Sequence, residues 1–82
     1  GLGGGSADAA AVLRALDRLA SDPLGLGRLA ELGAHLRSDV PFAMRGGVML
    51  VEGRGERLLP LTWVLPPRWW CLLVCPPIPV RP

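Results

Sequence analysis

Two stretches of the chain carry residue types that could do chemistry. Residues 1–7 run Gly-Leu-Gly-Gly-Gly-Ser-Ala and lead directly into an alanine-rich segment with helical spacing. Glycines let the backbone approach a ligand closely, and the free N–H groups of a first helical turn favour an anion such as phosphate. Asp39, in Ser38-Asp39-Val40-Pro41, supplies a carboxylate that could act as a general base, although alone it would be interpreted as a turn residue.

Three kinds of glycine-rich segment have to be distinguished. A Walker A loop needs Gly-Lys followed by Ser or Thr, and all nine basic residues of this chain are arginine. The dinucleotide-binding pattern G-x-G-x-x-G fails at its third glycine, where this chain has Ser6, and no strand precedes it. A flexible linker is the simplest alternative, but the segment from Ala7 onward continues into an amphipathic helix, which disfavours it.

The spacing of apolar residues predicts a first helix over residues 7–20. Ser6 is placed as its N-cap and Asp8 in its first turn, where a carboxylate suits the helix dipole. A second helix is expected over residues 26–36, where two glycines make it dependent on packing. The apolar faces are expected to contain Val12, Leu13, Leu16, Leu19 and Ala20 on the first helix and Leu29, Leu32 and Leu36 on the second.

After a turn at residues 38–41, the period of the pattern changes. Residues 48–52 and 57–61 predict two short strands joined by a turn at 53–55, and the nearly continuous apolar residues 69–75 predict a buried strand. Prolines prevent the tail from joining a sheet. Helices followed by strands predict an α+β fold.

Composition excludes several classes of protein. A net charge of +2 on 82 residues describes neither a polybasic nucleic-acid-binding arm nor an acidic tail. Cys71 and Cys75 are too few for a disulfide scaffold and lack a second ligand pair for zinc, so they are expected to be small core residues. Residues 69–75 are far fewer than the roughly 20 that a membrane helix needs. His35 is expected to face solvent, and Trp69 and Trp70 are expected to pack in a core or between domains rather than against bases.

Three motifs, in order along the chain, resemble those of the GHMP kinase superfamily. Residues 1–10, GLGGGSADAA, resemble its phosphate-binding motif, most closely in the form found in 4-diphosphocytidyl-2-C-methyl-D-erythritol kinases. Residues 38–42, SDVPF, resemble the Gly-Ala-Asp-Val-Pro-Phe stretch of that family, and residues 53–60, GRGERLLP, resemble its G-x-G-E-x-L-x-P segment. The match covers residues 1–61 well and the Pro- and Trp-rich remainder only loosely.

The resemblance implies an ATP-dependent small-molecule kinase. This family transfers the ATP γ-phosphoryl group, with Mg²⁺, to the 2-hydroxyl of a cytidine diphosphate-linked methylerythritol, in the non-mevalonate route to isoprenoids. The resemblance further implies that Asp39 orients this hydroxyl and accepts its proton. It implies a cytoplasmic enzyme without nucleic-acid or membrane partners, and it leaves the oligomeric state open. The residues that would wrap the ATP phosphates are Gly1, Leu2, Gly3, Gly4, Gly5, Ser6 and Ala7.

The resemblance also makes the chain an internal fragment of a larger kinase. Residues 1–62 would belong to an N-terminal ATP-binding domain with a ribosomal protein S5 domain 2-like fold, and residues 63–82 would lead toward the C-terminal domain. The catalytic lysine and the cytidine-binding residues of the family lie ahead of its glycine loop, so this chain alone is expected to be inactive.

Departures from the family pattern keep two alternatives open. Ala7 stands where the family often has a second serine, and Arg37-Ser38 replaces Gly-Ala before Asp39. One alternative is another GHMP kinase acting on a different small alcohol. The other is a non-catalytic nucleotide-binding fragment.

Overall fold

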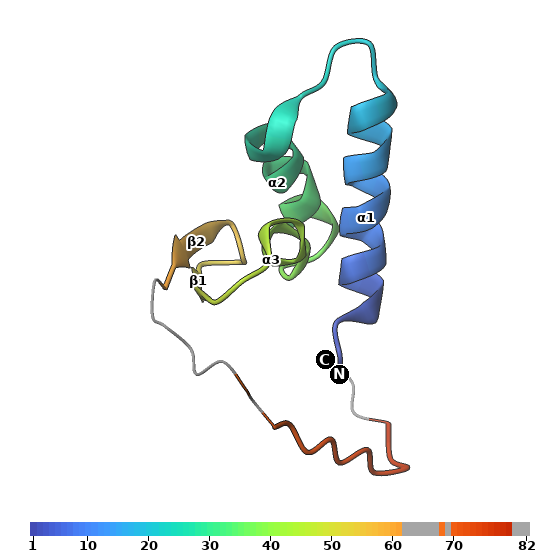
Figure 1. Cartoon of the computed structure of the whole chain (residues 1–82), viewed down its shortest axis with the longest axis vertical. Helices are drawn as coiled ribbons and strands as arrows, with labels where there is room; N and C mark the ends of the chain where they lie inside the picture. Colours follow the sequence, from blue (N-terminus) through green and yellow to red (C-terminus); the bar gives the residue numbers. More distant parts are fainter. Residues whose placement is uncertain (62–67, 69, 80–82) are drawn as a thin grey trace.

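The structure is a computed structural model of the chain, and it describes residues 1–61, 68 and 70–79. Within these residues it contains three helices followed by a two-stranded antiparallel sheet (Figure 1). This order confirms the α+β class. The elements are α1 (Gly4–Leu19), α2 (Gly25–Leu36), α3 (Val40–Arg45), β1 (Met49–Glu52) and β2 (Arg57–Pro60).

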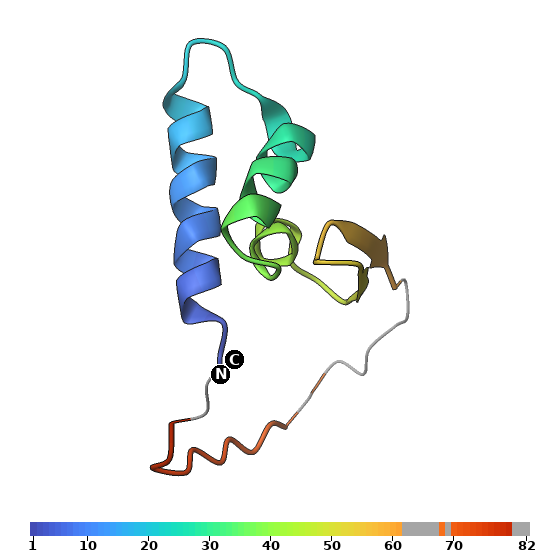
Figure 2. The ribbon, with the colours of Figure 1, turned by 180° about the vertical axis from the view of Figure 1, so that it is seen from behind.

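The helices pack around a small core centred on α3. This short helix contacts both α1 and α2, and both views show it between α1 and the β-hairpin (Figures 1 and 2). Gly33 of α2 permits its close approach, because a Cβ there would lie 2.7 Å from Val40 Cγ1 and 3.0 Å from Met44 Cε. The second helix, intrinsically weak, is therefore stabilised by tertiary packing. The core consists of Ala10, Leu29, Val40 and Met44, with Ala9, Leu13 and Ala43 packed against it.

The hairpin is the second unit of the fold. β1 and β2 pair from Met49 opposite Pro60 to Glu52 opposite Arg57, within a residue of the predicted strands. The predicted turn between them is also confirmed, and the N–H of Gly55 donates to the carbonyl of Glu52 at 3.2 Å. A single two-stranded hairpin is at best marginally stable, so its attachment to the helices matters.

The first helix begins earlier than predicted. α1 starts at Gly4, and its N-cap is Gly3 rather than Ser6. Gly3 has a φ of +71°, which glycine adopts without strain, and its carbonyl accepts a hydrogen bond from Ala7 N–H at 3.0 Å. Ser6 is consequently inside the first turn and only 6% exposed, while Asp8 lies beyond that turn. The predicted cap is wrong because the glycines themselves continue the helix.

The packed faces of the helices differ from the predicted ones. α1 packs through small residues such as Ala10, and Leu13 is half-buried, but Val12, Leu16 and Leu19 are exposed. α2 buries Leu29 and Gly33 while Leu32 and Leu36 are exposed. Of the residues predicted for the apolar faces, only Leu13 and Leu29 pack in or against the core. The close contacts with α3 require small side chains, which hydrophobicity alone does not select.

The predicted turn at residues 38–41 is shorter than expected, because α3 begins within it. Only Ser38 and Asp39 form the turn, and Val40 starts the helix. Pro41 is compatible with this first helical turn, where a backbone N–H has no intrahelical partner. Val40 and Pro41, predicted to belong to the turn, thus lie in the first turn of a helix.

Residues 70–75 do not form the predicted buried strand. Trp70 is 96% and Leu72 90% exposed, and Cys71 and Cys75 are free and exposed, so the prediction of core cysteines is wrong. Trp70 is not packed in a core either, and its packing between domains stays a prediction. Trp69, at the start of the predicted strand, lies outside the described residues. The described sheet offers this segment no pairing partner, and a buried strand requires one for its backbone groups. None of the described helices is long and apolar enough to cross a membrane.

Candidate functional site: a glycine loop and an exposed aspartate

The glycine loop presents backbone donors at an uncovered helix end. Residues 4–6 form the first turn of α1, so their N–H groups have no intrahelical partner, and no side chain caps them. A Cβ built on any glycine of residues 1–5 would meet no neighbouring atom within 4 Å. Gly4 and Gly5 are exposed, and unpaired N–H groups at the positive end of a helix fit a phosphate group.

The side chains of the loop contribute little to this arrangement. Leu2 and Ala7 are exposed and apolar, and Ser6, the one residue here with a hydroxyl, is buried on the same face of α1 as Ala10. The predicted phosphate contacts from residues 1–7 would therefore come from the backbone.

Asp39 lies directly before α3 on a well-bonded backbone. Its carbonyl accepts a hydrogen bond from Ala43 N–H at 2.9 Å, and the preceding turn closes with a bond of 3.2 Å from Val40 N–H to the carbonyl of Arg37. Its side chain is exposed and does not cap α3. The main chain of Asp39 is thus fixed by hydrogen bonds, while its carboxylate is free to contact a ligand, as a general base must be.

The helical core brings the elements that carry the loop and the aspartate together. Val40, next to Asp39 in the chain, belongs to the same buried cluster as Ala10 of α1. Ala10 lies about 9 Å along the helix axis from Gly4, at the usual rise per residue. Among the described residues, no hydrogen bond or ion pair joins Asp39 to the loop. The two parts of the predicted site therefore lie on packed helices but do not contact each other through polar groups.

Gly55 is a residue whose contact sequence reasoning missed. It is buried although its neighbours in the turn are exposed, and its φ is +101°. A Cβ on Gly55 would overlap the carbonyl oxygen of Ser38 and lie 2.6 Å from its carbonyl carbon. The hairpin turn therefore packs against the main chain immediately before Asp39. The G-x-G-E segment in the sequence indicated that Gly55 matters, but nothing in the sequence indicated that it contacts Ser38.

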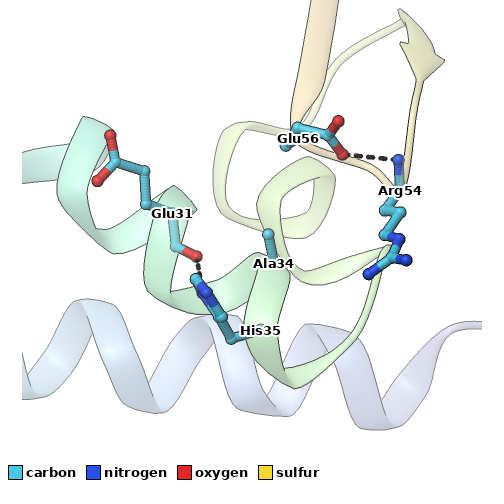
Figure 3. Close-up of a pocket in the computed structure, with 5 residues that line it drawn as sticks. All are labelled: Glu31, Ala34, His35, Arg54 and Glu56. Carbon is cyan, nitrogen blue, oxygen red and sulfur yellow. Dashed lines mark hydrogen bonds between the residues drawn. The ribbon is translucent and has the colours of Figure 1, made fainter.

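Glu56 keeps this turn in shape. Its Oε2 accepts a hydrogen bond from the backbone N–H of Arg54 at 2.6 Å (Figure 3). Its own backbone N–H and then that of Arg54 hold the pKa of the Glu56 carboxyl below its ordinary value of 4.5, against a small opposing effect of desolvation. These bonds give Glu56 a structural role in the turn.

A hollow of about 420 Å³ lies between α2 and this turn (Figure 3). His35, which is exposed as predicted, donates from Nδ1 to the carbonyl of Glu31 at 2.8 Å. Two carboxylates, an imidazole and a guanidinium give the hollow no single preference of charge. The lining residues are Glu31, Ala34, His35, Arg54 and Glu56.

The described residues contain no group of three or more His, Cys, Asp or Glu side chains that could hold a metal ion. Magnesium is usually bound by one or two carboxylates together with substrate phosphates, so a protein-only cage is not required.

Comparison with known proteins agrees with this geometry. The model of a family described as "GHMP kinases N terminal domain" matches residues 1–47, more than half of the chain. The chain belongs to the GHMP kinase family. The region that matches the GHMP kinase N-terminal domain contains both the glycine loop and Asp39, together with α1, α2 and α3.

Curated relatives make the similarity more specific. This GHMP kinase chain is 55% identical, over 93% of its length, to the 4-diphosphocytidyl-2-C-methyl-D-erythritol kinase of Chromohalobacter salexigens. It is 51% identical to the kinase of that name from Bacillus pumilus and 50% identical to that from Levilactobacillus brevis, over 98% of its length in each case. The chain spans only 24%, 27% and 28% of these three relatives. No solved structure matches it.

Proposed function

We propose that the full-length protein carrying this chain phosphorylates the 2-hydroxyl of 4-diphosphocytidyl-2-C-methyl-D-erythritol with ATP, on the non-mevalonate route to isoprenoids. Relatives at about half identity bear the name of that kinase, which supports the proposal. The structural observation that carries it is an uncovered helix N-terminus on α1 and an exposed Asp39 beside α3, on helices that share one core.

The glycine loop binds the phosphates of ATP in this proposal. The unpaired N–H groups of residues 4–6 donate to phosphate oxygens, and the helix dipole of α1 favours their negative charge. Positioning and charge stabilisation dominate phosphoryl transfer, so fixed backbone donors suit the reaction. Magnesium bound to the ATP phosphates would partly neutralise their charge, and no ligand of this chain is assigned to it.

Asp39 acts on the acceptor alcohol. Its carboxylate takes the proton of the 2-hydroxyl while that oxygen forms a bond to the γ-phosphorus. The bond from the γ-phosphorus to the β–γ bridging oxygen breaks, and ADP leaves with the electron pair. Asp39 is exposed and not engaged in capping α3, which supports this assignment.

The proposal extends to the organisation of the full-length enzyme. Residues 1–62 belong to the N-terminal ATP-binding domain, of ribosomal protein S5 domain 2-like fold, and residues 63–82 lead toward the C-terminal domain. The substrates are small charged molecules, so the enzyme works in the cytoplasm without nucleic-acid or membrane partners.

The test is turnover by the full-length protein and its Asp39→Asn variant. The wild type should release ADP with the cytidyl substrate and much less with mevalonate, homoserine or galactose. Removing the general base should lower kcat by about 10²–10⁴-fold and leave the dissociation constant of ATP nearly unchanged. Asp22→Asn, at another exposed aspartate, is the matched control and should keep the wild-type kcat.

Two outcomes contradict the proposal in different ways. Near-normal turnover by Asp39→Asn overturns the role of Asp39. Turnover of another alcohol in preference to the cytidyl substrate makes the protein a different GHMP kinase.

A further inference from the structure

The hairpin turn and the aspartate lie far apart in the sequence but touch in the fold. Gly55, between β1 and β2, packs on the carbonyl group of Ser38, whose carbon atom is bonded to the nitrogen of Asp39. Any displacement of that carbonyl group therefore moves Asp39 directly. The Asp39 carboxylate is exposed and has no side-chain partner among the described residues, so its location depends on its main chain.

We propose that the turn at residues 53–56 is a positioning element that fixes the backbone of Ser38 and thereby the carboxylate of Asp39 for phosphoryl transfer. This inference rests on the function proposed above. Gly55 is the contact residue, and Glu56 is the residue that keeps the turn in the shape that makes the contact. Neither touches a substrate, so both are positioning residues rather than catalytic ones.

Gly55 is required at this place for two separate reasons. Its φ of +101° lies in a region that residues with a Cβ rarely adopt. A Cβ would also overlap Ser38 O and approach Ser38 Cα to 2.9 Å, and these are backbone atoms that cannot rotate away. The neighbouring Gly53 differs, because its Cβ would meet only the flexible side chain of Glu56.

The main chain that follows Asp39 is fixed by packing, and the hairpin contact acts on the main chain that precedes it. Val40 is fully buried under α1 and α2, and the N–H of Val40 donates a hydrogen bond to the carbonyl of Arg37. Ser38 lies between that buried anchor and the end of α2. The hairpin turn adds a contact from a different element, because Gly55 packs on the carbonyl group of Ser38. A shift of about 1 Å in a catalytic group can cost on the order of 10²-fold in rate.

The primary test compares two glycines of the full-length kinase. Gly55→Ala introduces both backbone strain and the clash with Ser38. Gly47→Ala is the matched control, because Gly47 also has a positive φ, of +79°, but a Cβ there meets nothing within 4 Å. Gly55→Ala should lower kcat by about 10–100-fold, with KM for ATP unchanged because the glycine loop is on α1. Gly47→Ala should keep kcat within about twofold of wild type and should lose only the thermal stability that a positive φ costs.

A second pair of variants decides the question if Gly55→Ala does not fold. Glu56 is exposed, so Glu56→Ala removes the acceptor for Arg54 N–H without disturbing the core. It should lower kcat several-fold at unchanged KM for ATP. Glu56→Gln retains an amide oxygen that accepts the same bond and should restore most of the turnover. Rescue by glutamine separates positioning from a general loss of stability.

The outcomes separate this inference from the function on which it rests. An inactive wild-type enzyme overturns both. An active wild type that loses turnover in Asp39→Asn, but retains it in Gly55→Ala to the same degree as in Gly47→Ala, overturns the positioning role alone. A kcat of Glu56→Ala equal to that of wild type does the same.

Discussion

Glu56 shows how one exposed side chain fixes a turn. Backbone N–H groups point at its carboxylate, and they bind the ionised form better than the protonated form. A carboxyl with a lowered pKa adds stability that is fully present above its unfolded value of 4.5 and is lost as the pH falls through the lower folded value. The turn at residues 53–56 should therefore loosen only in the acid range below 4.5.

This pH dependence can be observed at the amide of Arg54. In an NMR titration, the Arg54 amide resonance should shift with a midpoint below 4.5, because its N–H follows the ionisation of Glu56. Glu56→Gln cannot titrate and serves as the control, with a flat profile over the same range. A midpoint at or above 4.5 would contradict the hydrogen bond that defines the turn.

For single residues, the candidate site residues could be chosen from the sequence, but several of their contacts could not be predicted. The glycine loop and Asp39 were predicted as site residues from their motifs, and His35 was correctly expected to face solvent. The role of Gly55 was not predictable, because its partner Ser38 belongs to a different element and only the folded chain brings them together. A positive φ and a close backbone approach are properties of the conformation rather than of the residue alone.

The contact between α2 and α3 depends on one missing side chain. Gly33→Ala places a Cβ 2.7 Å from Val40 Cγ1, and Val40 is itself fully buried, so the helices must move apart. This overpacking should destabilise the protein by about 1–3 kcal/mol. Gly27→Ala is the matched control in the same helix, because a Cβ there meets nothing within 4 Å, and it should stabilise by roughly 0.5–1 kcal/mol.

Urea denaturation of the two variants in the full-length protein measures this difference. Opposite signs of the change in unfolding free energy are expected, although both substitutions are glycine to alanine within α2. Equal stabilisation by both would show that α3 does not pack on Gly33 as described.

Asp17 joins α1 to the start of α2. Its Oδ1 accepts a hydrogen bond from Leu24 N–H at 2.6 Å, and its Oδ2 accepts a longer one from Gly25 N–H at 3.3 Å. Asp17→Ala leaves donors at this helix start without a protein acceptor and should destabilise by about 1 kcal/mol. Asp22→Ala, in the same connection, is the control and should change the thermal midpoint of the full-length protein far less. Equal shifts of the thermal midpoint in both variants would show that the hydrogen bonds of Asp17 do not stabilise the start of α2.

The existence of the elements was predictable, while their boundaries and faces depended on tertiary packing. Period and composition correctly predicted two helices and a hairpin in order. They missed α3, since six residues that include Pro41 have no helical period of their own and form a helix because Val40 and Met44 are buried against α1 and α2. They also predicted a buried strand at 70–75, where the required neighbouring strand is absent from the described sheet.

The whole chain leaves much apolar surface uncovered. Only four hydrophobic residues of the described part form the buried core, while Leu19 is 83% exposed and Trp70 almost completely so. The chain spans about a quarter of the length of its relatives. In the full-length kinase, the uncovered faces of α1 and α2 are therefore the surfaces on which we expect the remaining chain to pack. They include Val12, Leu16, Leu19, Leu32 and Leu36.

The isolated 82-residue chain should consequently lack a cooperative transition. A core of this size and a lone hairpin do not offset the conformational entropy of the chain, so ellipticity should decrease gradually on heating. The same preparation should bind a hydrophobic dye strongly, whereas the full-length kinase should melt sharply and bind little. Replacing Leu16 and Leu19 by glutamine should reduce dye binding by the isolated chain, where both residues are exposed. The same change should destabilise the full-length protein, in which we expect both residues to be covered. A sharp melt of the fragment, or an unchanged stability of the full-length variant, would show that these faces are true solvent surfaces.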